Sequence, residues 1–515
     1  MKSKKYLKAV LCVLLAAALL AGCTNAAVNN ISELSEQAGT TAVQVSEPAS
    51  ETISAVSEAS SESESASETV SGATEATSTT AAGVSVVDNG VSKTDTATTK
   101  QTGKKSGKKK TQPTTEPEPV YIDIVLLKNG KAKCSSPNVS LAASEVLIEK
   151  AGDYRITQST GGKPWHGQII LKLKNTEKAE LRFENVNIEY NSNNIIQLID
   201  KSIKTNRSFL ETESATAEDE IKDIADNDLA PNVQLSFPEG TKSTIVTTAN
   251  SVTGALYNES KLTIKGHGTA TFESRKNANN CICSTKSIKI RNLNLNLVTA
   301  QHDNTSTLAS NTGSARGIYS YSKVTLESGT LNVQSNGDGI RCDEFDALGG
   351  TANIKSSACD GIDADDAIVI SGGAITSTAL EKSSFKVRRI NNTENGAPKG
   401  VREGKGDTFA INGGIVRGES KRITTVQKVS KQPSITCKIV KPSRGTSAAA
   451  TESKVPAIIE IKNLKKSSNK CTKFLYSSSA VTKNKKYTAT ANGKNAESKW
   501  NGSVAIIDIE STNNR

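Results

Sequence analysis

Asn336-Gly337-Asp338-Gly339-Ile340 is echoed 22 residues later by Ala358-Cys359-Asp360-Gly361-Ile362, which runs on into Asp363-Ala364-Asp365-Asp366. Both copies carry an acid, a glycine and an isoleucine at the same offsets, and both lead into a strand-like pattern. A repeat of this length is typical of a stacked β-solenoid, in which each repeat forms one turn of a coil. The two copies therefore predict neighbouring turns.

The flanking sequence can be aligned on the isoleucine of this repeat. One column then holds Ile282, Ile318, Ile340 and Ile362, and the column six residues later holds Ile288, Val324, Asp346 and Ile368. Small residues follow two positions after each isoleucine: Ser284, Ser320, Cys342 and Ala364. Because side chains alternate along a strand, Ile362 and Ala364 should face the interior, whereas Asp363 and Asp365 should face outward.

A second strand follows a glycine turn in each repeat. Its copies are Gly268-Thr269-Ala270-Thr271-Phe272, Gly329-Thr330-Leu331-Asn332-Val333, Gly350-Thr351-Ala352-Asn353-Ile354 and Gly373-Ala374-Ile375-Thr376. A later copy, Phe409 to Ile415, comes after what reads as an irregular insertion near Lys386 to Lys399. We expect an all-β fold, a right-handed parallel β-helix (solenoid) with β-rich N-terminal and C-terminal capping segments. A flat β-sandwich is the alternative, but unrelated sandwich strands would not keep the 22-residue register.

The N-terminus resembles a bacterial lipoprotein signal. A basic start, Met1-Lys2-Ser3-Lys4-Lys5, precedes an apolar run too short to span a membrane comfortably, and Leu20-Ala21-Gly22-Cys23 follows. The resemblance implies that residues 1–22 are removed and that Cys23 is lipidated, which anchors the chain on the extracellular face of the cell membrane. An ordinary secretory signal is the alternative.

Residues 23–119 are a low-complexity segment of Ser, Thr, Ala and Glu that cannot bury a core, and we expect a disordered tether. Its basic end, Lys104 to Lys110, is either a solvated charge run or a contact for anionic wall polymer. Residues 120–425 should form the β-helix, and residues 426–515 a β segment that acts as a cap. The net charge of +11 is shared between the tether and the Lys-rich C-terminal third, and we expect no nucleic-acid partner.

The cysteines do not suggest a metal site. Of nine, Cys12 lies in the signal peptide and Cys23 is the lipid site, so seven remain in the folded part. Seven is an odd number, so at least one thiol stays free or pairs between chains. Without a CxxC pair, and with three His in the whole chain, zinc has little support.

The acidic turns predict a hard cation. Neighbouring strands lie about 4.8 Å apart, so Asp338 should stack beneath Asp360, and Asp343 beneath Asp365. Bare carboxylates at that distance repel, and Ca²⁺ accepts about six to eight oxygen ligands in loose geometry. The candidate ligands are Asp338, Asp343, Asp360, Asp363, Asp365 and Asp366. The alternative is that each Asp bonds its own backbone in an Asx-turn.

The order of these motifs resembles the carbohydrate-binding β-helix domains of clostridial lipoproteins, which are similar in fold to pectate lyases. The resemblance is carried by Gly254-Ala255-Leu256-Tyr257, by Lys261 to Gly266 and by the Asp-Gly-Ile turns, and it extends from Val120 to Gly493. The family carries Asp-Gly-Ile in more turns, where this chain has Asn280-Cys281-Ile282 and Arg316-Gly317-Ile318. Fewer calcium sites are therefore expected here.

The resemblance implies a calcium-bearing surface protein that binds plant cell-wall polysaccharide, including acidic, pectin-like sugars. Because no His/carboxylate pair or nucleophile motif stands out in the sequence, we expect binding without catalysis. Four outward positions beside the acidic turns are the candidate sugar-binding residues: Tyr257, Tyr319, Tyr321 and Arg341. A guanidinium can hold a uronate carboxylate through a bidentate fork, although such an Arg more often neutralises acidic neighbours.

Two other functions stay open. A pectate-lyase-like polysaccharide lyase would need calcium on the uronate and a cationic side chain that removes the adjacent proton. Arg341, Arg388 and Arg389 are candidates for that role by residue type alone. The other alternative is a non-catalytic surface adhesin or scaffold.

Overall fold

The computed structural model describes residues 119–203, 229–249, 253–275, 280–300, 315–388, 408–422, 426, 430–441, 453 and 455–511. All of them belong to the second of the two units into which the chain divides, Lys109–Arg515. The predicted signal peptide, Cys23, the tether up to residue 118 and Arg389 lie outside the described residues. Within these ranges, no helix has the length and apolarity needed to cross a membrane.

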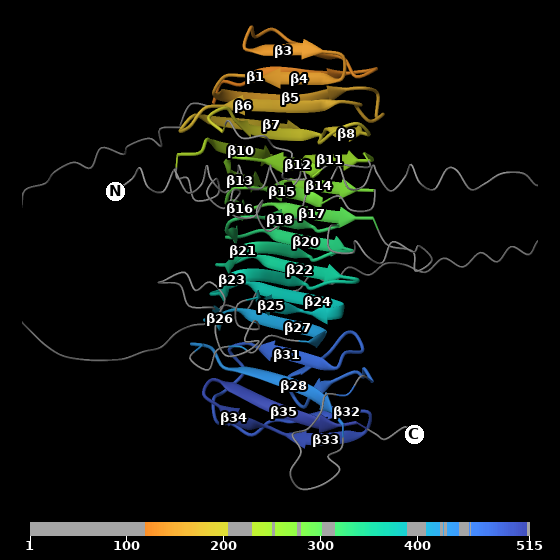
Figure 1. Ribbon diagram of the computed structural model, residues 1–515, viewed down its shortest axis with the longest axis vertical. Helices are drawn as coiled ribbons and strands as arrows, with labels where there is room; N and C mark the ends of the chain where they lie inside the picture. The colour runs from red at the N-terminus through yellow and green to blue at the C-terminus, as the bar shows by residue number, and fades with distance from the viewer. Residues whose placement is uncertain are drawn as a thin grey trace, which may run out of the picture. The chain divides into compact units, whose positions relative to one another are not determined.

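The fold is all-β, and its strands form three sheets (Figure 1). The first sheet contains β1 (Ile122–Leu127), β2 (Ala132–Cys134), β3 (Val139–Ala142), β4 (Glu145–Ile148), β5 (Gly152–Ser159), β6 (Gln168–Leu173), β7 (Lys178–Glu184), β9 (Ile196–Asp200), β10 (Asn232–Phe237), β12 (Gly254–Asn258), β13 (Lys261–Gly266), β15 (Asn280–Ser284), β16 (Ile288–Arg291), β18 (Ile318–Ser320), β19 (Val324–Leu326), β21 (Ile340–Ala347), β23 (Ile362–Ile370), β25 (Phe385–Val387) and β26 (Thr408–Ile411). The second contains β8 (Asn187–Tyr190), β11 (Lys242–Thr247), β14 (Thr269–Ser274), β17 (Asn294–Thr299), β20 (Thr330–Ser335), β22 (Thr351–Ser356), β24 (Ala374–Ser383), β27 (Ile415–Arg422), β28 (Ser434–Val440), β31 (Lys473–Ser477), β34 (Lys499–Asn501) and β35 (Val504–Glu510). The third contains β29 (Glu460–Ile461), β30 (Lys465–Lys466), β32 (Thr488–Ala491) and β33 (Lys494–Glu497).

The strands of successive repeats pair in parallel, as the 22-residue echo predicts. Ile282 pairs with Ile318, Ile318 with Ile340, and Ile340 with Ile362, so the predicted isoleucine column is confirmed. Figure 1 shows these strands stacked one above another through the green and teal part of the fold. We call each repeat of first-sheet and second-sheet strands a rung; residues 338–356 and 360–379 are two adjacent rungs.

The second predicted column is wrong at one position. Val324 pairs with Phe345, and Phe345 pairs with Ile368, so the aromatic ring rather than Asp346 faces the interior. The register between β21 and β23 shifts after Cys342 because β23 carries one extra residue there, as in a β-bulge. Asp346 instead lies on the outer face, where it forms an ion pair with Lys323 at 2.8 Å.

The second sheet confirms the predicted second strands. β14, β17, β20, β22 and β24 pair in parallel, each with the next, without a register shift from Thr269 to Ala379. The turn before β24 needs glycine, because Gly373 has a φ of 80° and a Cβ there would lie 2.4 Å from the carbonyl oxygen of Gly350. The glycine turns therefore lead the chain from the first sheet into the second at the equivalent position of each rung.

The segment that begins at Lys386 was expected to be an irregular insertion, and its first residues are regular. β25 pairs in parallel with β23, which sets Phe385 beside Ile362 and Lys386 beside Asp363. Phe385 is fully buried in the core, as the isoleucines before it are. The rung therefore continues through Val387, and Lys386 belongs to the outward column that includes Asp363.

One apolar core runs through the stacked rungs, and the C-terminal part has a second. Side chains from both long sheets share the first core, from Ile124 to Leu475 and Val504. The second core lies among β28, β31, β35 and the third sheet. β31 joins the two parts because it pairs antiparallel with both β27 and β28.

All seven cysteines of the described part are free thiols. Six are buried, and Cys134 is partly buried. Burial raises the pKa of Cys281 and of Cys283 to about 12, since the thiolate would lose its hydration. These thiols therefore behave as small apolar side chains.

The register can be tested at Phe345 and Asp346. Phe345→Ala removes a fully buried ring and should lower the free energy of unfolding by about 3–5 kcal/mol. Asp346→Ala breaks a partly exposed ion pair and should cost less than about 1 kcal/mol. Urea unfolding of the full chain, followed by circular dichroism, measures both. Equal costs, or a larger cost for Asp346→Ala, would contradict the register.

Candidate functional site

Three carboxylates converge on one spot of the first sheet. Asp338 and Asp360 end the turns that precede β21 and β23, and Asp363 is the second residue of β23. One oxygen of each lies within 4.8 Å of the other two. The residues are 4%, 2% and 1% exposed, so the group, which we call the aspartate cluster, is buried.

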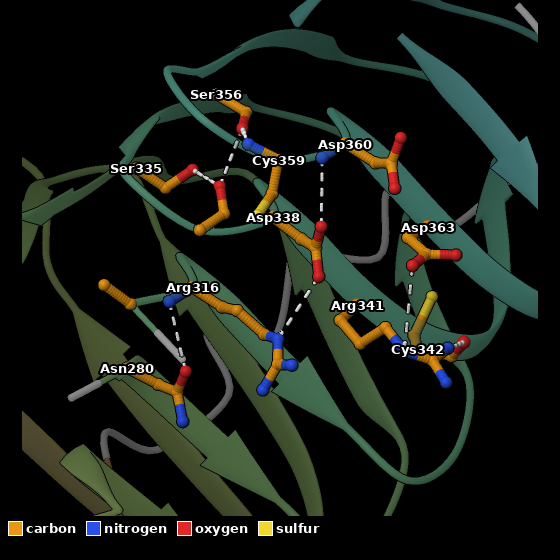
Figure 2. A network of polar contacts seen from close by, with 12 residues as sticks. Asn280, Arg316, Ser335, Asp338, Arg341, Cys342, Ser356, Cys359, Asp360 and Asp363 are labelled. Atoms are coloured by element: carbon orange, nitrogen blue, oxygen red, sulfur yellow. Dashed lines mark hydrogen bonds and ion pairs between the residues drawn. The ribbon is translucent and has the colours of Figure 1, made fainter. Parts of the chain in front are cut away.

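The turns hold these carboxylates by stacking on one another (Figure 2). Asp338 Oδ1 accepts a hydrogen bond from the amide of Asp360 at 3.0 Å, and Asp360 Oδ1 accepts one from the amide of Ser383 at 2.7 Å. The turn glycine leaves no space for a side chain, because a Cβ at Gly361 would lie 2.0 Å from Ser377 Oγ. Each acid therefore fixes the turn of the next rung, whereas the Asx-turn alternative has each Asp bond its own local backbone.

The remaining oxygens face cations from two rungs, one on each side of the acids. Arg316 Nε lies 3.2 Å from Asp338 Oδ2. Lys386 Nζ lies 3.0 Å from Asp360 Oδ2 and 3.2 Å from Asp363 Oδ2, and Arg388 Nη2 approaches Asp363 Oδ2 to 2.8 Å. The chain thus supplies its own positive charges to the stacked acids.

Arg341 and Asp365 form a further pair beside the cluster. Both carboxylate oxygens of Asp365 accept from Nη2 of Arg341, at 2.7 and 2.8 Å, and the Arg341 side chain is almost fully buried. The alternative role of Arg341, which is to neutralise acidic neighbours, is the one seen in this geometry. A uronate would have to displace Asp365 to reach the Arg341 guanidinium.

Asp343 and Asp366 lie outside the aspartate cluster. Asp343 was expected beneath Asp365, but the register shift puts Asp365 and Asp366 together opposite it. Asp366 is buried on β23, whereas Asp343 is partly exposed. Of the six acids proposed as metal ligands, the fold therefore brings three close together.

Burial and cations shift the cluster's acids in opposite directions. Burial raises the pKa of Asp338. Arg316 lowers this pKa in part, and the negative charges of Asp363 and Asp360 raise it further. Burial also acts on Asp363, but Arg388, Arg341 and Lys386 outweigh it and lower the pKa of Asp363. Asp363 is thus held more firmly as a carboxylate than Asp338 is.

The predicted tyrosines are partly brought together. Tyr319 pairs with Arg341 across adjacent rungs, and its ring lies 4.6 Å from that of Tyr321. Arg316 covers the Tyr319 ring, with its guanidinium carbon 4.4 Å from the ring centroid. The expected exposure of Tyr257 is wrong: the residue is 4% exposed, and its hydroxyl donates to Glu259 at 2.7 Å.

Three cations of the site were not predicted from the sequence as site residues. Arg316 was noted only as a departure from Asp-Gly-Ile, and Lys386 and Arg388 were assigned to an insertion or to catalysis. A usable signal exists, since Phe385-Lys386-Val387 repeats the spacing of Ile362-Asp363-Ala364. A residue of opposite charge one rung away from an acid is the expected partner in a parallel stack.

The aspartate cluster suits Ca²⁺ in donor type, because it offers hard carboxylate oxygens close together. However, the ammonium of Lys386 bridges Asp360 and Asp363, and Arg316 contacts Asp338. A metal ion would therefore compete with Lys386 for the same oxygens.

The two pKa shifts predict opposite pH trends for two Asp→Asn variants. The lowered pKa of Asp363 makes its contribution to stability present at neutral pH and lost as the pH falls below about 4. The raised pKa of Asp338 makes its contribution present at low pH and lost as the pH rises through the folded-state pKa. The stability gap between wild type and Asp363→Asn should shrink toward acid, and the gap for Asp338→Asn should shrink toward neutrality. Urea unfolding between about pH 2.5 and 7 measures both, and parallel trends would contradict the assignment.

Comparison with known proteins gives a family and one distant structural likeness. A family model described as "Carbohydrate-binding domain-containing protein" matches residues 142–422, more than half of the chain. A solved polysaccharide lyase-like protein from C. thermocellum, studied as a gadolinium derivative, aligns with a TM-score of 0.38 and 20% identity, over 52% of this chain and 93% of that one. No curated protein matches. On the family match, which includes every residue of the aspartate cluster and its four cations, the chain belongs to the carbohydrate-binding domain-containing protein family.

Proposed function

We propose that the chain is a lipid-anchored protein of the bacterial cell surface that binds acidic polysaccharide without catalysis. In this proposal the stacked rungs are the turns of a right-handed parallel β-helix, Cys23 carries the lipid, and the basic end of the tether meets anionic wall polymer. One observation carries the sugar assignment: within the family-matched region, four cations surround the buried, stacked acids of adjacent rungs, and two of them, Lys386 and Arg388, are partly exposed.

Partly exposed charged side chains beside the aspartate cluster can contact a polyuronate. The side chains of Lys386 and Arg388 are 28% and 39% exposed, and Asp365 lies beside them with a similar exposure. A uronate carboxylate can exchange with Asp365 for the same guanidinium groups, because both are carboxylates that accept from an Arg fork. A polymer with a carboxylate on every sugar presents such groups repeatedly, so several weak exchanges add together.

Calcium is the second part of the proposal. Asp338, Asp360 and Asp363 would hold it, with the ammonium of Lys386 moved out toward solvent. Ca²⁺ would supply a divalent charge that protein and uronate carboxylates can share. The partial exposure of Lys386 supports this, since a long side chain at the surface can leave its partners without unfolding the rung.

The proposal that the protein is not a catalyst rests on the protonation state of Arg341 and Arg388. A lyase needs a base that can take a proton beside the uronate. Burial would lower the pKa of Arg388, but its bonds to Asp363 raise the pKa above the usual range, and Asp365 and Asp363 do the same for Arg341. Both guanidiniums are therefore held in the protonated form, in which they cannot accept a proton.

Binding can be measured by affinity electrophoresis of the full chain through polygalacturonate. Retention is expected, and Arg388→Gln should weaken it at least about tenfold, as expected for loss of a charge-assisted contact. Lys265→Gln, which removes a cation paired with Glu180 elsewhere on the same sheet, is the matched control and should bind normally. Absorbance from unsaturated sugar ends should not accumulate; steady production would replace this proposal with a lyase. No retention on any polysaccharide would favour an adhesin or scaffold.

Calcium can be tested at Lys386. Lys386→Gln leaves Asp360 and Asp363 with less positive charge, so the variant should melt lower than wild type in EDTA. Added Ca²⁺ should then raise its melting temperature more than that of wild type, because a ligand at 100 times its Kd stabilises by about 2.7 kcal/mol. Differential scanning calorimetry with Lys265→Gln as control measures this. An equal rise in melting temperature for all three proteins would show that Ca²⁺ does not bind at the aspartate cluster.

A further inference from the structure

The described residues from Ser430 to Ser511 form a strongly basic part of the chain. They include thirteen lysines, no arginine and four acids: Glu460, Glu497, Asp508 and Glu510. Three of these acids each face a lysine, in a strand pair or an ion pair: Glu460 with Lys466, Glu497 with Lys486, and Asp508 with Lys438. The lysines outnumber the acids about threefold, so this surface attracts anions.

A tryptophan is partly exposed in this basic part. The chain has two tryptophans; Trp165 is 1% exposed, whereas Trp500 is partly exposed. Trp500 on β34 pairs with Ala505, and both lie on the side of the sheet that faces the second core. Its ring centroid is 6.3 Å from that of Tyr487, and its Nε1 donates to the backbone carbonyl of Lys485 at 2.8 Å. The indole is therefore held in one position with part of its surface open to solvent.

The segment that contacts this indole carries three lysines. The amide of Thr482 donates to the hydroxyl of Tyr487 at 2.7 Å, and the amide of Tyr487 donates to Oγ of Ser498 at 3.0 Å, which fixes the segment beside the start of β34. Lys485 Nζ lies 5.8 Å from the centroid of the Tyr487 ring. Three side chains of the segment are exposed: Lys483, Lys485 and Lys486. We call these lysines and Trp500 the lysine–tryptophan patch.

We propose that the lysine–tryptophan patch is a second binding site for acidic polysaccharide. The inference rests on the proposed function and adds a contact outside residues 142–422, the range that the family model matches. The open part of the Trp500 ring would stack on the apolar C–H face of a pyranose ring, and the lysines would meet uronate carboxylates of the same chain. An ammonium is a point charge on a flexible stem, so it does not require one fixed carboxylate geometry. Two sites on one polymer strengthen binding through effective concentration.

The patch favours an acidic sugar chain over the other anionic partners of a bacterial surface. A polymer of glycerol phosphate would satisfy the lysines, but it has no ring to stack on Trp500. A membrane surface would take up several apolar side chains. In the described residues from Ser430 to Ser511, the large apolar side chain exposed by more than half is Val455, at 52%. A uronate chain uses both the charge and the aromatic ring.

Tryptophan fluorescence of the full chain reports on the patch directly, with tetragalacturonate as the probe. The emission of wild type should shift on titration, because the ligand covers Trp500. Trp500→Phe keeps a ring at this position and keeps the buried Trp165, so it should show no shift. Arg388→Gln alters the site beside the aspartate cluster and should keep the shift of wild type.

Two charge-matched pairs of substitutions test the lysines by affinity electrophoresis through polygalacturonate, read against polymer-free gels. Lys483→Gln with Lys485→Gln changes two exposed side chains and should weaken binding about fivefold. Lys494→Gln with Lys499→Gln removes the same charge and should bind as wild type does. Lys494 lies at the turn between β32 and β33, the far end of that pair from Thr488, and Lys499 pairs with Ile506, on the other side of the sheet from Trp500.

The outcomes separate this inference from the proposed function. If wild type is retained by polygalacturonate and Arg388→Gln weakens retention, but tetragalacturonate leaves the emission of wild type unchanged, the patch is not a sugar site and the proposed function stands. If wild type is not retained and its emission does not shift, the proposed function itself fails. Equal losses for the two lysine pairs would mean diffuse attraction and would overturn the site.

Two further probes identify a different occupant. Vesicles of phosphatidylglycerol and poly(glycerol phosphate) are titrated into wild type in the same fluorescence assay. A shift with either of them, and none with tetragalacturonate, would assign the patch to a membrane or to a phosphate polymer and would overturn the sugar assignment.

Discussion

In-register stacking of parallel strands is the constraint on which the rest of the structure depends. Each outward or inward side chain meets the side chain at the same position one rung away, at about 4.8 Å. Apolar side chains can stack in this way directly, because like residues pack favourably on one another, as Ile282, Ile318, Ile340 and Ile362 do. Charged residues satisfy it only if the sign changes from rung to rung, and the column Arg341, Asp363, Lys386 does so. Amide side chains stack by bonding one another, as Asn296, Asn332 and Asn353 do on the second sheet.

The aspartate cluster is where this constraint is most demanding, because Asp338 and Asp360 occupy the same position in adjacent rungs and carry the same sign. The flanking rungs resolve the conflict with Arg316 on one side and Lys386 on the other. Buried ion pairs of this kind add little net stability, since desolvation offsets much of the attraction, but losing one partner leaves a costly buried charge. The cluster therefore specifies which rungs lie next to each other more than it strengthens the fold.

Much of the stack could be predicted from the sequence, because inward columns and turn glycines recur at fixed offsets. Ile318, Ile340 and Ile362 recur every 22 residues and identify rungs without any knowledge of contacts, and Gly329, Gly350 and Gly373 mark the same corner. The Phe345 register could not be predicted, because one extra residue in β23 changes which positions face each other and leaves the apolar pattern nearly unchanged. The burial of Tyr257 was missed for a different reason: alternation tells which side of a strand a residue faces, but not what covers it. Arg316 and Lys386 were missed because the acids that they contact lie more than twenty residues away in the chain.

The buried thiols have a consequence for how the protein responds to oxidants. Thiols react with oxidants as thiolates, and a pKa near 12 leaves almost none of Cys281 or Cys283 in that form at neutral pH. No disulfide links the described rungs, so their folding calls for no oxidising catalyst, and exposure to air should neither cross-link these positions nor convert them to sulfinic acids. The buried thiols should therefore keep one covalent form with or without oxygen, and Cys134, which is partly buried, should be the first of the seven described thiols to be oxidised.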